Sequence, residues 1–376
     1  MIIVDFFSDT KSEMNTVVYR SVIPSNALRK AGHCVTNLNI RHWIKQTREA
    51  RLACVEADVI IIQRTLFQES ISFADYWRQR GKTVILDFDD AYQLIEKHNT
   101  AYKFWGAAKV DVESPEGEKT ESALNFNPVD QLRLGMGKVS GATMPSRILA
   151  QDWKPFGRTY YQPNYFDTSL FKVKPEGLRF YKDRIIIGWG GSTSHWQSFE
   201  GSGIVPAISS LIEEFPEIIV LIVGDKRIHD ALPFPSTHKT YLPYVKWYEW
   251  PMMIHRFDIG IAPMYGRYDD SRSHIKTCEY VLAGIPFVAS ISPAFYDFRE
   301  VGMYATGGDS LKQEDFDQRA LSWKDRLTKV ITDLEGERKS ILAKRHLALR
   351  WDAYKNVSNI TNLYKQIKTE ADSIVG

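Results

Sequence analysis

Short apolar runs alternate with longer amphipathic segments along this chain, and this alternation constrains the fold more than any other feature of the sequence. The runs are rich in β-branched residues, which is typical of strands buried on both faces of a sheet. In the first half of the chain, strands are predicted at residues 2–6, 34–38, 58–63, 83–88, 141–145 and 159–163, with helices at 15–30, 72–80 and 129–139. Strands that alternate with helices favour a parallel sheet with helices on both faces.

Residues 91–127 interrupt this pattern, because they are polar and contain Pro115 and Gly117. We interpret them as a long irregular segment, and segments of this length often form functional lids or binding loops.

The alternation starts again after residues 172–183, a charged stretch that we interpret as a domain boundary. Strands are predicted there at residues 185–189, 218–223, 259–262 and 287–290, helices at 204–215 and 273–283, and helical structure from 323 onward. We therefore expect an α/β protein with two Rossmann-like domains, at residues 1–172 and 173–350. A C-terminal helix at residues 351–376 is expected to pack back on the first domain.

The composition excludes several classes of protein. Lys and Arg number 48 against 46 Asp and Glu, and the net charge of +2 excludes a strongly basic nucleic-acid coat, though not a local basic patch. The three cysteines, Cys34, Cys54 and Cys278, form no CxxC motif, which favours reduced thiols and a cytoplasmic protein. No apolar run approaches the roughly 18 residues of a membrane-spanning helix, and the first residues lack the basic stretch of a secretory signal.

A glycine-rich turn follows the first strand of the second half. Gly190, Gly191 and Ser192 come directly after the strand at residues 185–189. Glycines let backbone N–H groups approach an anion closely, and a hydroxyl adds a further donor. An ordinary tight turn between strand and helix explains the same pattern equally well.

The helix predicted at residues 273–283 combines a cation with a carboxylate. Ser271 or Ser273 is suited to cap it, while Lys276 and Glu279 stand three residues apart and share one face. A phosphate at the helix start with a hydroxyl-rich group beside it would fit this face. The alternative is an exposed Lys–Glu pair on a capped helix.

Three carboxylates follow the buried strand at residues 83–88. Asp87, Asp89 and Asp90 are suited to hold a hard cation or to accept hydrogen bonds from sugar hydroxyls, and their alternative role is capping and solubility. Arg64 ends the preceding strand, where it faces either a cleft or the solvent.

Four basic residues, Arg41, Lys45, Arg48 and Arg51, recur at nearly helical spacing. They form either a basic face for an anionic acceptor or a membrane surface, or simply the solvated face of a helix.

These motifs together resemble GT-B glycosyltransferases of the GT4-like group. The most specific part is S-x-x-K-x-x-E-Y-x-x-x-G-x-P-x-V-A-S, which matches residues 273–290. Weaker similarities are the glycine turn at 187–194, the strand at 218–225, the DIGIAP strand at 258–263, the YQPNYFD element at 161–167 and the LDFDD element at 86–90.

The resemblance implies a GT-B fold, in which two Rossmann-like domains face each other across a cleft and C-terminal helices follow. It also implies a nucleoside diphosphate sugar as donor co-substrate, no other cofactor, no metal, and retention at the anomeric carbon. The implied donor-binding residues are Gly190, Gly191, Ser192, Ser271, Arg272, Ser273, Lys276 and Glu279, of which Lys276 and Glu279 are catalytic. The implied acceptor-binding residues are Arg64, Asp87, Asp89 and Asp90, and the acceptor is a hydroxyl-bearing glycan, lipid-linked sugar or modified nucleic acid.

The chain departs from the group in two places. Many relatives carry two Glu residues separated by seven others, and the first of these positions falls on Ser271, with Asp269 and Asp270 as the nearest carboxylates. The glycine turn after the first strand is replaced by residues 8–11. Three alternatives therefore stay open: a non-catalytic sugar- or nucleotide-binding protein, an enzyme that modifies nucleic acid, and a GT-A enzyme whose Asp87 and Asp89 hold manganese.

Overall fold

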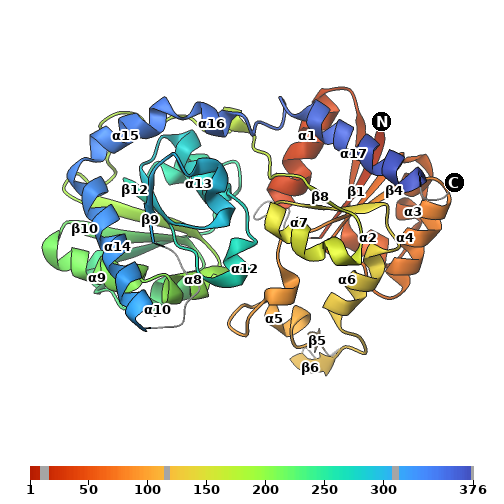
Figure 1. Ribbon diagram of the computed structural model, residues 1–376, viewed down its shortest axis with the longest axis horizontal. Helices are drawn as coiled ribbons and strands as arrows, with labels where there is room; N and C mark the ends of the chain where they lie inside the picture. Colours follow the sequence, from red (N-terminus) through yellow and green to blue (C-terminus); the bar gives the residue numbers. More distant parts are fainter. Residues whose placement is uncertain (9–16, 114–118, 307–312, 374–376) are drawn as a thin grey trace. The chain divides into compact units, whose positions relative to one another are not determined.

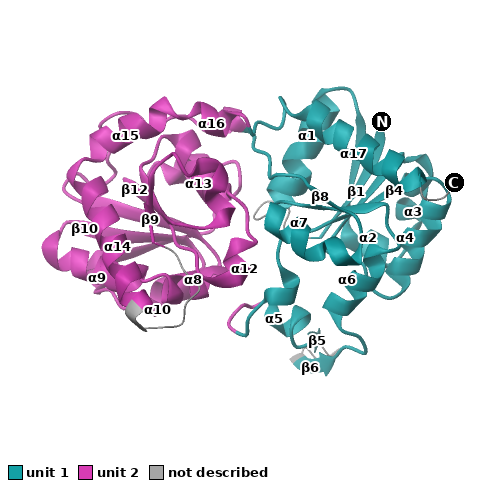
Figure 2. Cartoon of the chain, viewed as in Figure 1, with its two compact units in different colours: residues 1–97, 101–167, 351–376 teal, residues 98–100, 168–350 magenta. Residues whose placement is uncertain are grey.

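The computed structural model describes residues 1–8, 17–113, 119–306 and 313–373 (Figure 1). The chain forms two compact units (Figure 2). Unit 1 contains residues 1–97, 101–167 and 351–376, and unit 2 contains residues 98–100 and 168–350.

Unit 1 is built on a six-stranded parallel sheet in the order β2-β1-β3-β4-β7-β8. Its strands are β1 (Ile2–Phe7), β2 (Cys34–Asn39), β3 (Val59–Gln63), β4 (Thr83–Asp87), β7 (Gly141–Met144) and β8 (Thr159–Tyr161). Each lies within two residues of a predicted strand. The central strands β3 and β4 are almost entirely buried, as their unbroken apolar sequences require.

Helices cover this sheet (Figure 1). They are a π-helix at Val18–Val22, α1 (Ile23–Lys30), α2 (Ile40–Ile44), α3 (Arg48–Glu56), α4 (Glu69–Gln79), α6 (Pro128–Met136), α7 (Arg147–Trp153) and α17 (Val357–Asp372). The start of the first predicted helix, at residues 15 and 16, lies outside the described residues. The C-terminal helix α17 lies beside α1 and contacts β4, so the two ends of the chain build one unit (Figure 1).

Residues 91–113 and 119–127 are more ordered than the sequence predicts, whereas Pro115 and Gly117 lie outside the described residues. They contain α5 (Tyr102–Trp105) and an antiparallel pair of strands, β5 (Lys109–Glu113) and β6 (Lys119–Ala123). Lys103 Nζ forms ion pairs with Asp111 and Glu121, one on each strand, at 2.5 and 2.8 Å. The prediction of an irregular segment was wrong because β6 (KTESA) has no apolar face, and the alternation of Val110 and Val112 with charged residues in β5 is too short to be recognised as a strand.

Unit 2 contains a second six-stranded parallel sheet, in the order β11-β10-β9-β12-β13-β14. Its strands are β9 (Ile185–Gly191), β10 (Ile218–Gly224), β11 (Lys239–Pro243), β12 (Ile259–Ala262), β13 (Phe287–Ser290) and β14 (Met303–Ala305). The edge strands β11 and β14 were not predicted, because neither is an apolar run flanked by turn signals.

The helices of unit 2 are α8 (Trp196–Gly201), α9 (Ile204–Glu214), α10 (Lys226–Ala231), α11 (Trp250–Ile254), α12 (Gly266–Asp270), α13 (Ile275–Ala283), α14 (Gln313–Thr332), α15 (Leu334–Ala343) and α16 (His346–Leu349). A core of fully buried residues, with Trp189 of β9 and Trp323 of α14 among the largest, joins the sheet to α9 and α14.

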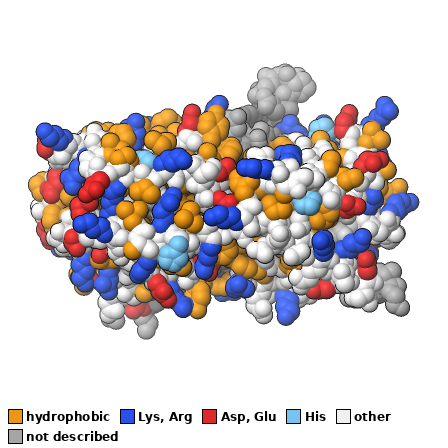
Figure 3. Space-filling model, turned by 90° about the horizontal axis from the view of Figure 1, so that it is seen from above, with side chains coloured by type: hydrophobic (Ala, Val, Ile, Leu, Met, Phe, Trp, Pro, Cys, Tyr) orange, Lys and Arg blue, Asp and Glu red, His pale blue; other side chains and the backbone are white. Residues whose placement is uncertain are grey.

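The surface agrees with the low net charge. In the face shown in Figure 3, basic and acidic side chains are interspersed with hydrophobic ones. No helix in the described ranges has the length and apolar character needed to cross a membrane.

Candidate functional site

The glycines at the end of β9 serve packing as well as backbone freedom. The strand continues through Gly190 and Gly191, which pair in register with Val223 and Gly224 of β10. A Cβ atom at Gly190 would lie 2.2 Å from the ring of Trp250, so a side chain there would displace that tryptophan. The tight turn predicted at the glycines begins one residue later, at Ser192.

The turn after β9 satisfies several of its own amides. The Ser194 N–H donates to Ser192 Oγ, and the His195 N–H donates to the Ser192 carbonyl at 3.1 Å. The pKa of Asp225 is lowered, mainly by hydrogen bonds from Arg227 and to a smaller extent by the Thr193 N–H. The amides of Thr193, Ser194 and His195 therefore have partners within the protein, and an anion near this turn needs other donors.

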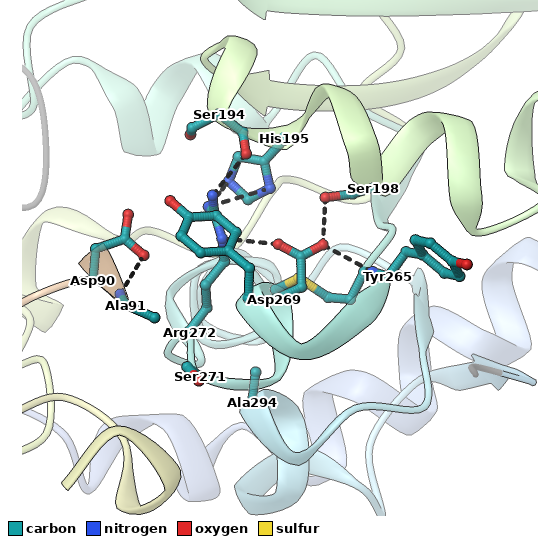
Figure 4. A network of polar contacts seen from close by, with 12 residues as sticks. Asp90, Ala91, Ser194, His195, Ser198, Tyr265, Asp269, Ser271, Arg272 and Ala294 are labelled. Carbon is teal, nitrogen blue, oxygen red and sulfur yellow. Dashed lines mark hydrogen bonds and ion pairs between the residues drawn. The ribbon is translucent and has the colours of Figure 1, made fainter. Parts of the chain in front are cut away.

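Arg272 is the centre of a polar network in unit 2 (Figure 4). Its Nη1 donates to His195 Nε2 at 2.6 Å, and its Nη2 donates to the Ser194 carbonyl at 2.8 Å. Its Nε lies 2.9 Å from Asp269 Oδ1 in an ion pair. Arg272 thus fixes the turn after β9 to α12.

Asp269 is held as firmly as its arginine partner. Asp269 Oδ2 accepts hydrogen bonds from Ser198 Oγ at 2.6 Å and from the Tyr265 N–H at 2.8 Å, and its side chain is buried (Figure 4). Ser198 of α8, the backbone at Tyr265 and the Arg272 side chain all bind this carboxylate. Asp269 therefore fixes the orientation of the Arg272 guanidinium.

His195 is a neutral imidazole in this network. Burial lowers its pKa well below the usual range, and the positive charges of Arg272 and Lys276 lower it further. Because its Nε2 accepts a hydrogen bond from a guanidinium, the single proton of the neutral ring is on Nδ1.

Lys276 reaches from α13 to the end of β9. Its Nζ donates to the Gly190 carbonyl and lies 4.7 Å from the centroid of the Trp189 ring. Burial lowers its pKa to about 8, although the negative charge of Glu279 acts in the opposite direction. The structure therefore brings together the cation and the glycine strand that the sequence placed 86 residues apart.

Glu279 lies one turn further along α13 and is buried, with 3% of its surface exposed, whereas Lys276 is half-buried. The alternative of an exposed Lys–Glu pair is therefore wrong, since Glu279 is buried and Lys276 is half-buried.

The predicted serine cap of this helix is also wrong. The helix begins at Ile275, and its N-cap residue is His274, which makes no side-chain capping bond. Ser271 instead ends α12, where its Oγ donates to the Arg267 carbonyl at 3.3 Å. The short helix α12, which the sequence did not reveal, moves the serines into the turn between two helices.

The predicted acidic residues of unit 1 lie at the carboxyl end of β4 and directly after it, Arg64 follows β3, and each has protein partners. Arg20 binds Asp87 through Nε at 3.0 Å and through Nη2, and Thr143 Oγ1 donates to the same carboxylate at 2.7 Å. Arg64 binds Asp89 through Nε at 2.6 Å.

Together with Val17 and Gln63, these charged residues line a small pocket in unit 1. Asp90 accepts a hydrogen bond from the Ala91 N–H at 3.0 Å. The structure thus pairs Asp87 and Asp89 with arginines. Asp87 is buried and accepts hydrogen bonds from Arg20 and Thr143, so its carboxylate is not free to bind a ligand.

Sequence reasoning missed Arg20, Asp269 as an orienting group, and His195. A signal existed for Arg20, since a charged residue inside an apolar helical stretch needs a buried partner. No signal marked the other two, because their partners are distant in the sequence.

Comparison with proteins of known structure identifies the fold. No protein-family model matches the chain, and no curated protein sequence matches it. Sucrose-phosphate synthase from Thermosynechococcus elongatus has a similar structure, with a TM-score of 0.63 and 12% identity over 97% of this chain and 98% of that one. HepE from Anabaena, in complex with UDP and glucose, gives a TM-score of 0.61 and 14% identity over 97% and 99% of the two chains. Trehalose-6-phosphate synthase OtsA gives a TM-score of 0.59 and 11% identity over 97% of this chain and 99% of that one.

These similarities show that the chain has the GT-B fold, as the sequence predicted. The GT-A alternative is therefore wrong. Its proposed manganese ligands, Asp87 and Asp89, are instead the partners of Arg20 and Arg64.

Proposed function

We propose that this protein is a glycosyltransferase that moves a sugar from a nucleoside diphosphate sugar to a hydroxyl-bearing acceptor. The proposed reaction retains the configuration at the anomeric carbon and requires no metal. The observation that supports it best is the position of Lys276, a half-buried ammonium at the carboxyl end of β9, the end at which open α/β sheets bind their ligands.

Lys276 would bind the diphosphate of the donor. When the glycosidic bond breaks, negative charge develops on the leaving diphosphate, and a fixed cation in a site that excludes water stabilises it strongly. Arg272 supports this arrangement by holding the turn at residues 192–195 in place. Gly190, Gly191 and Ser192 would border the diphosphate through the end of β9.

Glu279 would orient the donor by accepting hydrogen bonds from its ribose or sugar hydroxyls. A carboxylate can accept several such bonds, and its enclosure in unit 2 reduces competition from water. Ser271 and Ser273 complete the proposed donor side. Because Ser271 occupies the place of the first glutamate of similar enzymes, Asp269 contributes only through Arg272 in this proposal.

The proposed acceptor side is in unit 1, at Arg64, Asp89 and Asp90, with Asp87 acting through Arg20. The similarity to HepE, whose structure contains UDP and glucose, supports a nucleoside diphosphate hexose as donor.

Two measurements test the proposal. Nucleoside diphosphates should raise the melting temperature of the protein. A ligand that binds only the folded state increases the free energy of unfolding by about 2.7 kcal/mol when its concentration is one hundred times its dissociation constant. Glu279→Gln should still bind the diphosphate but lose donor hydrolysis and sugar transfer. Glu213→Gln, an exposed control in the same unit, should keep diphosphate binding, donor hydrolysis and transfer.

The two possible failures mean different things. Binding without any hydrolysis or transfer by the wild type would indicate a non-catalytic binding protein, and the absence of nucleotide binding would overturn the proposal.

A further inference from the structure

The helices α2 and α3 carry an unusual outer face. Ile44, Leu52 and Val55 are 49%, 56% and 53% exposed, although large aliphatic side chains are normally buried. Leu52 and Val55 stand three residues apart and therefore form one stripe on α3. We call this face the α2–α3 surface, and it also includes the exposed cations Arg41, Lys45, Arg48 and Arg51.

Neighbouring carboxylates neutralise these four cations only in part, since the charge of Arg48 acts on Glu49 without an ion pair between them. Within the part of the chain that the structure describes, none of them forms an ion pair with Asp or Glu. Arg51 donates instead to the carbonyl and the side-chain oxygen of Gln46, at 3.0 and 2.9 Å. Only Glu49 and Glu56 oppose them on the two helices, so the surface keeps a positive charge.

The scaffold beneath this surface is firmly packed. Trp43 of α2 is fully buried, with its ring centroid 5.1 Å from that of Phe6 and 4.5 Å from that of Phe73. Thr47 caps α3 by accepting a hydrogen bond from the Ala50 N–H at 3.3 Å. The outward side chains are therefore presented in a fixed arrangement, and their exposure does not result from a frayed helix.

We infer that the α2–α3 surface binds the anionic surface of a lipid bilayer. Aliphatic side chains interleaved with Lys and Arg side chains whose charge is not cancelled by an ion pair suit the boundary between lipid headgroups and acyl chains. Burial of the aliphatic groups and attraction of the cations to anionic headgroups both favour binding there. A single-stranded nucleic acid would instead require aromatic side chains on which bases stack, and the exposed apolar residues of α2 and α3 are aliphatic. This inference stands independently of the proposed sugar transfer.

Vesicle sedimentation tests the inference with the full chain. The protein should pellet with vesicles made of equal parts phosphatidylglycerol and phosphatidylcholine, but not with phosphatidylcholine alone. Raising the salt until the Debye length is about 3 Å should release most of the bound protein.

Two double variants separate the apolar and the charged contributions. Leu52→Ser with Val55→Ser should reduce binding to the anionic vesicles at least about tenfold, since both side chains lose contact with the acyl boundary. Lys45→Gln with Arg48→Gln should reduce it about twenty-fivefold, because each cation near an anionic surface contributes about a factor of five.

Matched controls come from other exposed sites. Leu321→Ser, at a leucine of α14 that is 68% exposed, should leave vesicle binding unchanged, and so should Lys365→Gln with Lys368→Gln on α17. Circular dichroism of each variant confirms that it is folded. Equal losses in the controls, equal binding to both kinds of vesicle, or stronger binding to a single-stranded oligonucleotide than to anionic vesicles would overturn the inference.

Discussion

Lys276 is a half-buried ammonium whose pKa of about 8 makes its charge sensitive to moderately alkaline pH. If it binds the diphosphate, affinity for a nucleoside diphosphate sugar should fall about tenfold between pH 7 and pH 9, as the ammonium loses its proton. Titration calorimetry at the two pH values measures this change.

The control for this prediction is Lys276→Arg, which stays charged throughout the range. Its affinity should vary little with pH, whereas Lys276→Ala should bind the diphosphate weakly at both values. A tenfold fall that persists in Lys276→Arg would assign the titration to another group.

Asp5 is a second buried group with a shifted pKa, and it lies in unit 1. Burial raises its pKa to about 7, the hydrogen bond from Ser21 lowers it, and the negative charge of Asp87 raises it again. The folded state therefore holds a proton that the unfolded state releases above its ordinary value near 4. The contribution of Asp5 to the free energy of unfolding should fall as the pH rises from 4 to 7, because at this group the unfolded state then binds fewer protons than the folded state.

Asp5→Asn removes this titration. The difference in unfolding free energy between wild type and variant should change by a few kcal/mol across this range, in the direction that disfavours the wild type at higher pH. Denaturant unfolding at several pH values provides the measurement, and parallel curves for the two proteins would contradict the assignment.

Residue types in the candidate site were predictable from the sequence, but most of their partners were not. The spacing of Lys276 and Glu279 within one helix is sufficient to place them on one face. Nothing local indicated that Arg20 would bind Asp87, 67 residues away, because such pairs depend on the order of strands in the sheet.

At the scale of elements, α13 depends on the glycine that ends it. Gly284 adopts a left-handed conformation, with φ at +69°, and a Cβ there would lie 2.7 Å from Leu342. Gly284→Ala should lower the free energy of unfolding by about 3 kcal/mol, from backbone strain and overpacking together.

Gly177 is a matched control, because it has the same φ and no atom within 4 Å of its added Cβ. Gly177→Ala should cost only about 1 kcal/mol, from backbone strain alone. Chemical denaturation compares the two variants, and equal losses would mean that Leu342 moves aside without cost.

Strands and helices with strong periodicity were predicted well, and weakly patterned ones were missed. The apolar runs of β3, β4, β10 and β12 identify buried strands directly. The hairpin β5–β6 and the edge strand β11 form because of neighbours elsewhere in the fold, so their own sequences carry little signal.

At the scale of the whole molecule, unit 1 is assembled from both ends of the chain. Ile360 and Ile367 of α17 are fully buried, and Tyr160 donates a hydrogen bond to Glu370 at 2.6 Å. Ile367→Ala should therefore destabilise unit 1 by about 3 kcal/mol, because it leaves a cavity against the sheet.

Hydrogen exchange followed by mass spectrometry resolves this effect by unit. Ile367→Ala should accelerate exchange in β1, β3 and β4, whereas Ile341→Ala, at a fully buried position of α15, should accelerate it only in unit 2. Faster exchange throughout the chain in both variants would mean that the two units unfold together.

The return of α17 to unit 1 also determines the order in which the chain can fold on the ribosome. Residues 1–167 are translated first, yet the helix that covers part of their sheet follows residues 168–350. At ordinary translation rates, the synthesis of unit 2 takes about 10 to 40 seconds. Throughout that interval the nascent unit 1 exposes the apolar surface that Ile360 and Ile367 later cover. The part of the protein that is made first is therefore completed last. We expect a chaperone to bind this exposed surface until α17 is synthesised.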